Sequence, residues 1–220
     1  MSCPIDNHKD NESTHQDDNL RTEKGCASNR INDKNLMQQN ESQKQWPGQK
    51  MSLDTERVVS NIPNANEEGE MWIYPSEQQF FNAMKRKGWR QTQEKDMNSV
   101  VKIHNHVNDV VWLKILEYEK QHCEECPTPK LSKFLGRPDE LSPKAFFKST
   151  FMGYKKPFDR HDWVVDRCGQ KVRYVIDFYK GEMNAKQKEI GQVGFYVDVR
   201  PALDSFSSAV DRIRHIFNKI

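Results

Sequence analysis

The stretch "GYKKPFDRHDWVVDRCGQKVRYVIDFY", residues 153–179, contains the pattern that decides the fold. Its second half alternates apolar and polar residues on both sides of a turn at Cys168-Gly169, which is typical of two antiparallel strands with one buried face. The strands are expected at 163–166 and 172–179. A further alternating run follows and is expected to join the same sheet; its apolar residues are Val193, Phe195, Val197 and Val199.

A helix is expected before this sheet, in "YPSEQQFFNAMKRKGW". Ser76 is a good N-cap, Gln79 stands three residues later as its capping-box partner, and Gly88 provides a stop. Phe80 and Phe81 fall on one side of the helix with Met84. That side is therefore predicted to be buried.

Two short helices are predicted next, forming a hairpin that bends near Asn105. The first has Met97, Val100, Val101 and His104 at helical spacing, which places the imidazole of His104 on the apolar stripe. The second begins at Asn108 and has Trp112, Ile115, Leu116 and Glu119 along one side. A histidine in this position points inward.

The remaining segments complete an α+β chain. Residues 125–140 are interpreted as a proline-rich loop, and Ser142 with Pro143 predicts a short helix to about Phe151. A last helix is expected to be capped by Asp204, with Phe206, Val210, Ile213 and Phe217 as its apolar stripe. The predicted fold class is α+β: a small antiparallel sheet packed by several helices.

Composition divides the chain into two parts. Residues 1–70 have a single aromatic residue, Trp46, and are rich in Asn, Gln, Asp, Lys and Ser, so a disordered polar leader is expected there. Residues 71–220 hold nearly all the aromatic residues, which favours one domain. The net charge of +2 argues against a surface that coats nucleic acid, and no apolar run approaches the roughly 18 residues that span a bilayer. A soluble or peripheral protein is expected, without a typical secretory or transit peptide.

The five cysteines do not form a disulfide framework. His122, Cys123, Cys126 and Cys168 are residue types that bind zinc, but a second closely spaced pair is missing. No zinc is expected. Unpaired thiols or a bridge between Cys123 and Cys126 are favoured instead.

Several motifs together resemble the cytochrome c-type haem lyases, the holocytochrome c synthases of mitochondria. They are "WIYPSEQQFFNAMKRKGW", "KIHN", "GYKKPFDRHDWVVDRCGQKVRYVIDFY" and "DVRPALDS", and the resemblance covers roughly residues 72–213. It implies that residues 71–220 form a catalytic domain, a carbon-sulfur lyase, that joins haem to apocytochrome c or c1 by adding the thiols of a C-x-x-C-H segment across the haem vinyl groups. It also implies a place in the intermembrane space, peripheral on the inner membrane.

The resemblance assigns haem iron to His104 through "IHN". His106, two residues later, points elsewhere on a helix and is the alternative ligand. Without the family, a histidine on an apolar stripe is more often a hydrogen-bonded core residue. His161, between Arg160 and Asp162, is interpreted as a proton shuttle or as support for the second axial site. The alternative is a structural histidine held by Asp162.

Further candidates concern the rest of the haem. Arg160, Arg167 and Arg173, together with the lysines 155 and 156, are candidate partners of the propionates. A guanidinium pairs with a carboxylate through two parallel bonds. Trp72 is a candidate flat surface for the porphyrin. Cys3, in a "CPI" similar to short haem-regulatory motifs, is a candidate second iron ligand within the leader.

Two other functions are consistent with parts of the chain. A non-catalytic haem carrier or sensor needs the same His104 and Cys3 but forms no thioether. A nucleic-acid-binding module would depend on the basic run 85–91, which is better explained as cations at a helix C-terminus. No nucleic-acid partner is therefore expected.

Overall fold

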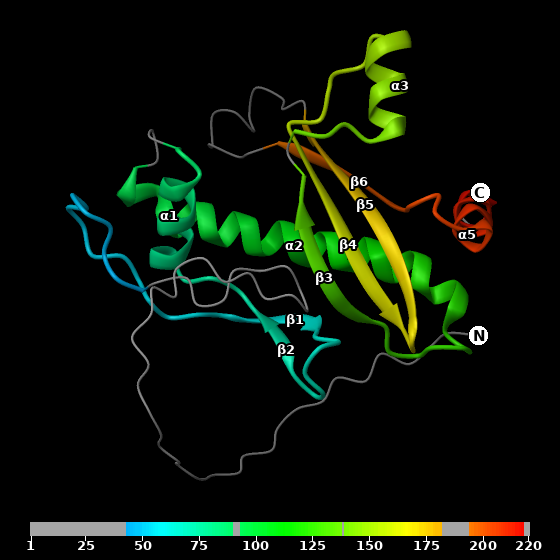
Figure 1. The fold of residues 1–220 in the computed structure, drawn as a ribbon, viewed down its shortest axis with the longest axis horizontal. Coiled ribbons are helices and arrows are strands. Elements are labelled where there is room, and N and C mark those ends of the chain that lie inside the picture. Colours follow the sequence, from blue (N-terminus) through cyan, green and yellow to red (C-terminus); the bar gives the residue numbers. More distant parts are fainter. Residues whose placement is uncertain (1–42, 90–92, 138, 182–193, 218–220) are drawn as a thin grey trace.

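The computed structural model describes residues 43–89, 93–137, 139–181 and 194–217. At its centre is a four-stranded antiparallel sheet in the order β3-β4-β5-β6 (Figure 1). The strands are β3 (Lys130–Gly136), β4 (Asp159–Arg167), β5 (Gln170–Lys180) and β6 (Phe195–Pro201). The turn between β4 and β5 has Cys168 and Gly169 at positive φ, as a tight reversal requires. The predicted fold class and the turn are confirmed; Val193 lies outside the described residues.

One face of this sheet, the inner face, packs against the long helix α2 (Met97–Glu119), which crosses it in Figure 1. Side chains alternate along a strand, so Trp163 and Val165 of β4 lie on the same face as Tyr174 and Ile176 of β5. All four are at most 1% exposed. Burying such side chains stabilises the fold by roughly 1.5–3 kcal/mol each.

The opposite face, the outer face, contains buried charges. Asp162 and Asp177 are completely buried there, and each is bound by arginine: Asp162 by Arg160 and Arg173, and Asp177 by Arg200. Buried carboxylates need such partners, since an unpaired charge in the interior is costly. The two faces of the sheet therefore have different chemistry.

The predicted bend near Asn105 is wrong, because α2 is one continuous helix of 23 residues. Asn108, expected to begin a second helix, is a buried residue within α2. Asn has only a modestly lower helix propensity than Ala, whereas Val111, Trp112 and Ile115 are all buried against the sheet. Packing of the whole apolar side thus outweighs a local helix-start signal.

The other predicted helix starts are largely confirmed. Helix α1 (Glu77–Arg86) begins with the capping box of Ser76 and Gln79, and Gly88 follows its end at φ 82. Helix α3 (Pro143–Phe151) begins at the Ser142 cap, whose hydroxyl accepts the N–H of Ala145 at 3.1 Å. The short helices η1 (Glu94–Asp96) and η2 (Lys120–His122) flank α2.

Three of the observed strands were not predicted from the sequence. β1 (Val59–Pro63) lies within the expected leader and pairs with β2 (Met71–Ile73), so regular structure begins before residue 71. β3 occupies the segment interpreted as a loop; its register shifts between Leu131 and Lys133, which interrupts the alternation that would have identified it.

Helix α5 (Phe206–Phe217) faces the opposite way from the prediction. Ser208 and Asp211 are buried, whereas Phe206, Ile213 and Phe217 are more than half exposed. Ion pairs orient the helix, because Asp211 binds Arg167 and His122. Its cap is Ser205, which accepts the N–H of Ser208, and the predicted cap Asp204 instead binds Arg173.

The predicted bridge between Cys123 and Cys126 is wrong: Cys126 is bonded to Cys168, 42 residues later. Cys168 lies in the β4–β5 turn, which the sheet brings beside the segment after η2. Cys123 is left as a free thiol. The pairing depends on tertiary structure and cannot be read from spacing.

Replacing Cys168 by serine should lower the free energy of unfolding by about 4 kcal/mol, because the bridge closes a loop of about 42 residues in the unfolded chain. Urea denaturation under non-reducing conditions measures this. The matched control, Cys123→Ser, should change stability by less than about 0.5 kcal/mol. Equal stability of wild type and Cys168→Ser would contradict the assigned bridge.

Candidate functional site

A cavity of about 380 Å³ lies at one end of the inner face, between the sheet and α2. This volume is within the usual range of ligand pockets. It is lined from α1, α2, β4, β5 and β6, and from the segment before β4, by Phe80, Val100, Ile103, His104, Val107, Asn108, Phe158, Asp159, His161, Phe178, Lys180, Gly194 and Phe195. His104 and His161 both line this pocket.

His104 projects from the first half of α2, and its ring meets that of Phe80 edge-on with centroids 4.9 Å apart. Burial, followed by the neighbouring His161, lowers the pKa of His104 to about 4. The charge of Asp159 raises the pKa of His104, whereas the charge of Lys87 lowers it further. The imidazole is therefore neutral at physiological pH, which is the form that binds a metal.

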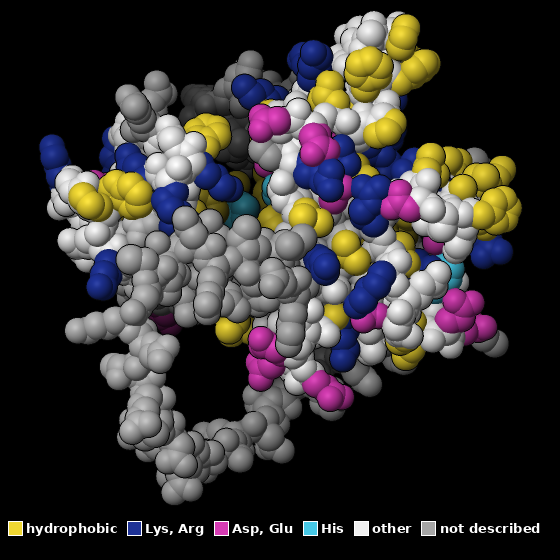
Figure 2. Space-filling view, in the orientation of Figure 1, with side chains coloured by type: hydrophobic (Ala, Val, Ile, Leu, Met, Phe, Trp, Pro, Cys, Tyr) yellow, Lys and Arg dark blue, Asp and Glu magenta, His cyan; other side chains and the backbone are white. Residues whose placement is uncertain are grey.

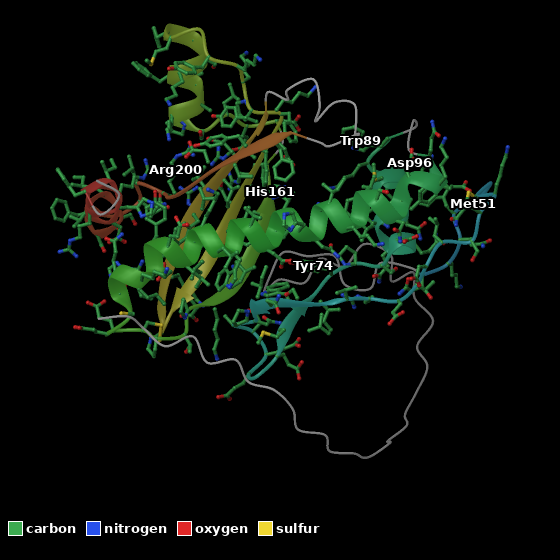
Figure 3. All side chains as sticks on the ribbon, turned by 180° about the vertical axis from the view of Figure 1, so that it is seen from behind. Met51, Tyr74, Trp89, Asp96, His161 and Arg200 are labelled. Atoms are coloured by element: carbon green, nitrogen blue, oxygen red, sulfur yellow. A yellow bond between two sulfur atoms is a disulfide. The ribbon has the colours of Figure 1, made fainter. Side chains whose placement is uncertain are left out.

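His161 lies on β4, beside α2 (Figure 3), and its Nε2 is 3.1 Å from Oδ2 of Asp159. Burial alone would raise the pKa of Asp159, but the hydrogen bond and charge of His161 bring the pKa below its usual value. Asp159 is thus a carboxylate that accepts Nε2–H. Nδ1 of His161 is buried and has no hydrogen-bond partner among the described residues.

The carboxylate expected to hold His161 was Asp162, and this is wrong. Residues 159 and 161 lie on the inner face because side chains two apart on a strand share a face, whereas Asp162 faces outward to Arg160. The rings of Phe134 and Phe178 meet His161 with centroids 4.7 and 4.9 Å away. The imidazole of His161 is therefore held in one orientation between apolar rings.

Comparison with known protein sequences identifies the family of this chain. The sequence model described as "Cytochrome c/c1 heme lyase" matches residues 1–216, nearly the whole chain. The chain belongs to this heme lyase family. No solved structure matches it.

Among curated relatives, the heme lyase chain is 47% identical over 173 residues to the holocytochrome c-type synthase of Gallus gallus, covering 76% of this chain and 61% of the relative. It is 42% identical over 216 residues to the holocytochrome-c synthase of Saccharomyces cerevisiae, covering 88% and 78%. A putative holocytochrome-c1 synthase of Schizosaccharomyces pombe is 49% identical over 157 residues, with 69% of each chain covered.

The heme lyase chain thus spans about three fifths of the length of the relatives from chicken and human. The family is mitochondrial. Across the described ranges, no helix is both long and apolar enough to cross a membrane.

The three predicted arginines of this heme lyase chain are not among the described residues lining the pocket. Arg160 binds Asp162 through two bonds of 3.0 Å, and Arg173 joins Asp162 to Asp204. Both lie on the outer face. Arg167 lies on the inner face and binds Glu119 at 2.7 and 2.9 Å. These ion pairs give each guanidinium a structural partner.

The remaining predicted residues are also away from the pocket or outside the structure. Trp72 packs against the main core, and its Nε1 donates to the carbonyl oxygen of Leu131 at 3.0 Å, so it joins β2 to β3. His106 is exposed on α2, unlike His104. Cys3 lies outside the described residues.

Sequence reasoning missed two polar residues that line the pocket. Asp159 could have been found from its i, i+2 relation to His161 on a strand. Lys180 is an exposed cation where the pocket opens, at the end of β5, and no local signal separates it from other surface lysines. Phe80 was expected on a buried face, and the structure adds that this face borders the pocket.

The low pKa of His104 predicts how stability depends on pH. Its pKa is about 6.5 when unfolded and about 4 when folded, so between these values the unfolded chain holds a proton that the folded chain lacks. Lowering the pH through this window should therefore destabilise the fold, by up to about 3 kcal/mol from this group. Urea denaturation at pH 7 and pH 4 measures the loss, which should be smaller in His104→Leu. An identical loss in both proteins would contradict the assignment.

Proposed function

We propose that this chain attaches haem covalently to apocytochrome c or c1, forming thioether bonds between the cysteines of a C-x-x-C-H segment and the haem vinyl groups. The observation that carries the proposal is the pocket in which His104 and His161 meet inside apolar walls. Membership of the family supports the reaction, and the names of the relatives supply both cytochrome classes.

His104 is the proposed ligand of the haem iron. Its neutral imidazole has a nitrogen lone pair available, and the phenylalanines lining the pocket suit the apolar face of a porphyrin. Lys180, an exposed cation that lines the pocket, is the proposed partner of a propionate. The proposal does not use Arg160, Arg167 or Arg173, because their carboxylate partners are within the chain.

His161 is the proposed proton carrier. A thiolate is the reactive form of cysteine, and Nδ1 of His161 is the unpaired acceptor for the thiol proton while Asp159 holds Nε2–H. The sulfur then bonds to the vinyl carbon next to the ring, and the proton is returned to the terminal vinyl carbon. Each addition conserves all atoms and electrons, so no oxidant is consumed.

Positioning supplies most of the rate in this scheme. The histidine of the C-x-x-C-H segment takes the iron position opposite His104, which places the two thiols over the vinyl groups. Orientation of this kind contributes up to roughly 7–11 kcal/mol in the best intramolecular cases. Release of the product requires His104 to leave the iron.

The proposal includes the cellular setting. We place the chain in the intermembrane space, peripheral on the inner membrane, in agreement with the mitochondrial family. Residues 71–220 are the proposed catalytic domain, together with β1 from the preceding segment. Cys3 is proposed to capture haem transiently before its transfer to the pocket.

Expression in a host that lacks its own haem-attachment machinery tests the function. Co-expression with apocytochrome c, and separately with apocytochrome c1, should produce cytochrome that keeps its haem on a denaturing gel. The matched control substrate has both cysteines of C-x-x-C-H replaced by serine and should retain none. Haem bound only to this chain, and removed by denaturation, would instead indicate the carrier.

A further inference from the structure

Helix α3 is covered by little else in the described structure. Ala145 is its only buried residue, while Phe146, Phe147 and Phe151 are each more than half exposed, as are Met152 and Tyr154 just beyond it. Figure 1 shows α3 standing away from the sheet, and hydrophobic atoms are prominent on it in Figure 2. Exposed apolar clusters of this kind mark interaction sites.

The helix is nevertheless firmly attached at its first turn. The hydroxyl of Ser142 donates to Asp177 at 2.6 Å and accepts from Arg200 at 2.7 Å, and Lys144 binds Asp198 at 2.7 Å. These contacts belong to the outer-face ion pairs. They hold α3 in a defined direction although its aromatic side chains contribute little to the core.

The charge of the segment is one-sided. Residues 143–158 contain four lysines, at 144, 148, 155 and 156, and no acidic residue. Helix α5, which also exposes several apolar side chains, differs: residues 203–217 contain two aspartates and two arginines, whose charges balance. Of these two helical segments, the α3 segment is the one that combines exposed aromatic rings with a net positive charge.

We propose that the α3 segment, residues 143–156, is the surface by which this protein docks on an anionic lipid bilayer, with its phenylalanines in the interface and Lys148, Lys155 and Lys156 at the headgroups. A short basic helix with aromatic side chains on its surface has the composition of interfacial helices. Lysine attracts anionic lipid, and its long apolar stem lets it stay at the headgroup level. This inference rests on the peripheral location in the proposed function and names the residues responsible.

The shape favours a bilayer over an acidic protein. Protein ligands that bind apolar side chains usually enter a concave groove. Helix α3 instead projects outward (Figure 1), and its phenylalanine rings are more than half exposed. A flat, fluid interface accepts a convex cluster of rings without matching its shape.

Flotation of the purified full chain with lipid vesicles tests the proposal. Wild type should float with vesicles of phosphatidylcholine mixed with phosphatidylglycerol, and much less with pure phosphatidylcholine. The variant Phe146→Ser/Phe147→Ser/Phe151→Ser should bind the mixed vesicles at least about tenfold more weakly. Lys148→Gln/Lys155→Gln/Lys156→Gln should lose the preference for anionic lipid and the sensitivity to salt.

The matched control is Phe206→Ser/Ile213→Ser/Phe217→Ser, which removes three exposed apolar side chains from α5 and should change binding by less than about twofold. An α3 variant that floats like wild type overturns the proposal, and so does an equal loss from the α5 variant. Retention of wild type by polyglutamate but not by vesicles would also overturn it, in favour of an acidic protein.

Haem attachment by the same variants, assayed with purified components without membranes, separates this inference from the proposed function. The α3 variant should keep attachment within about twofold of wild type, because the docking side chains are not among the described pocket-lining residues. Attachment without vesicle binding would overturn the docking surface alone. Vesicle binding without attachment would overturn the proposed reaction and support the surface.

Discussion

Replacing His104 by alanine should reduce the yield of covalently haem-bound cytochrome by at least about 100-fold, the scale of loss expected when a reacting group is displaced by about 1 Å. His104 is the neutral imidazole in the pocket, and its removal leaves the iron without its proposed ligand from this chain. The yield is measured by haem stain on a denaturing gel after co-expression. The absorption spectrum of haem bound to the purified chain should change as well.

Two controls distinguish ligation from a packing effect. His106→Ala removes an exposed imidazole two residues away on α2 and should leave the yield within about twofold of wild type. His104→Gly with added imidazole should recover part of the yield, because the free imidazole can occupy the vacated space and bind iron. Wild-type yield and an unchanged spectrum from His104→Ala would refute the ligand assignment.

Replacing Arg167 by alanine should destabilise the domain by about 3–5 kcal/mol, because it removes the cation from a buried group of carboxylates. Glu119 and Asp211 are at most 3% exposed and both bind this guanidinium. The hydroxyl of Tyr174 also donates to Glu119, at 2.6 Å. Although burial opposes it, the hydrogen bond and charge of Glu119 raise the pKa of Arg167.

Thermal unfolding measures this effect, with an expected fall in Tm of about 10 °C or more. The matched control is Lys171→Ala, which breaks the exposed pair with Asp166 and should cost less than about 1 kcal/mol. At temperatures where Arg167→Ala is folded, its haem binding should equal that of wild type. Unchanged stability with lost haem binding would instead support the sequence-based assignment of Arg167 to a propionate.

The sequence predicted the structure correctly where a few neighbouring residues determine it through their side chains and backbone. Ser76, Gln79 and Gly88 delimit α1, Ser142 begins α3, and the alternation on both sides of Cys168-Gly169 makes the β4–β5 hairpin. The family could also be recognised, because its motifs are dense in rare residues such as Trp and His. His104 was found through one of these motifs.

Contacts between residues that are distant in the sequence were not predicted correctly. The arginines of residues 153–179 look like binding residues in a one-dimensional sequence, but Glu119, Asp162 and Asp204 are placed against them by the fold. The fold likewise determines the disulfide of Cys126 with Cys168 and the outward-facing apolar stripe of α5.

The sequence by itself determined the α+β class, the hairpin, the capped helices and the family, because these depend on spacings of two to four residues and on motif identity. Only the tertiary structure decided that Asp159 holds His161, that α2 continues through Asn105, and which carboxylate binds each arginine. The physical reason is that a buried charged side chain pairs with an oppositely charged side chain that lies close to it in the folded structure. The packing of the helices on the sheet determines which side chain that is, and a local sequence pattern does not predict this packing.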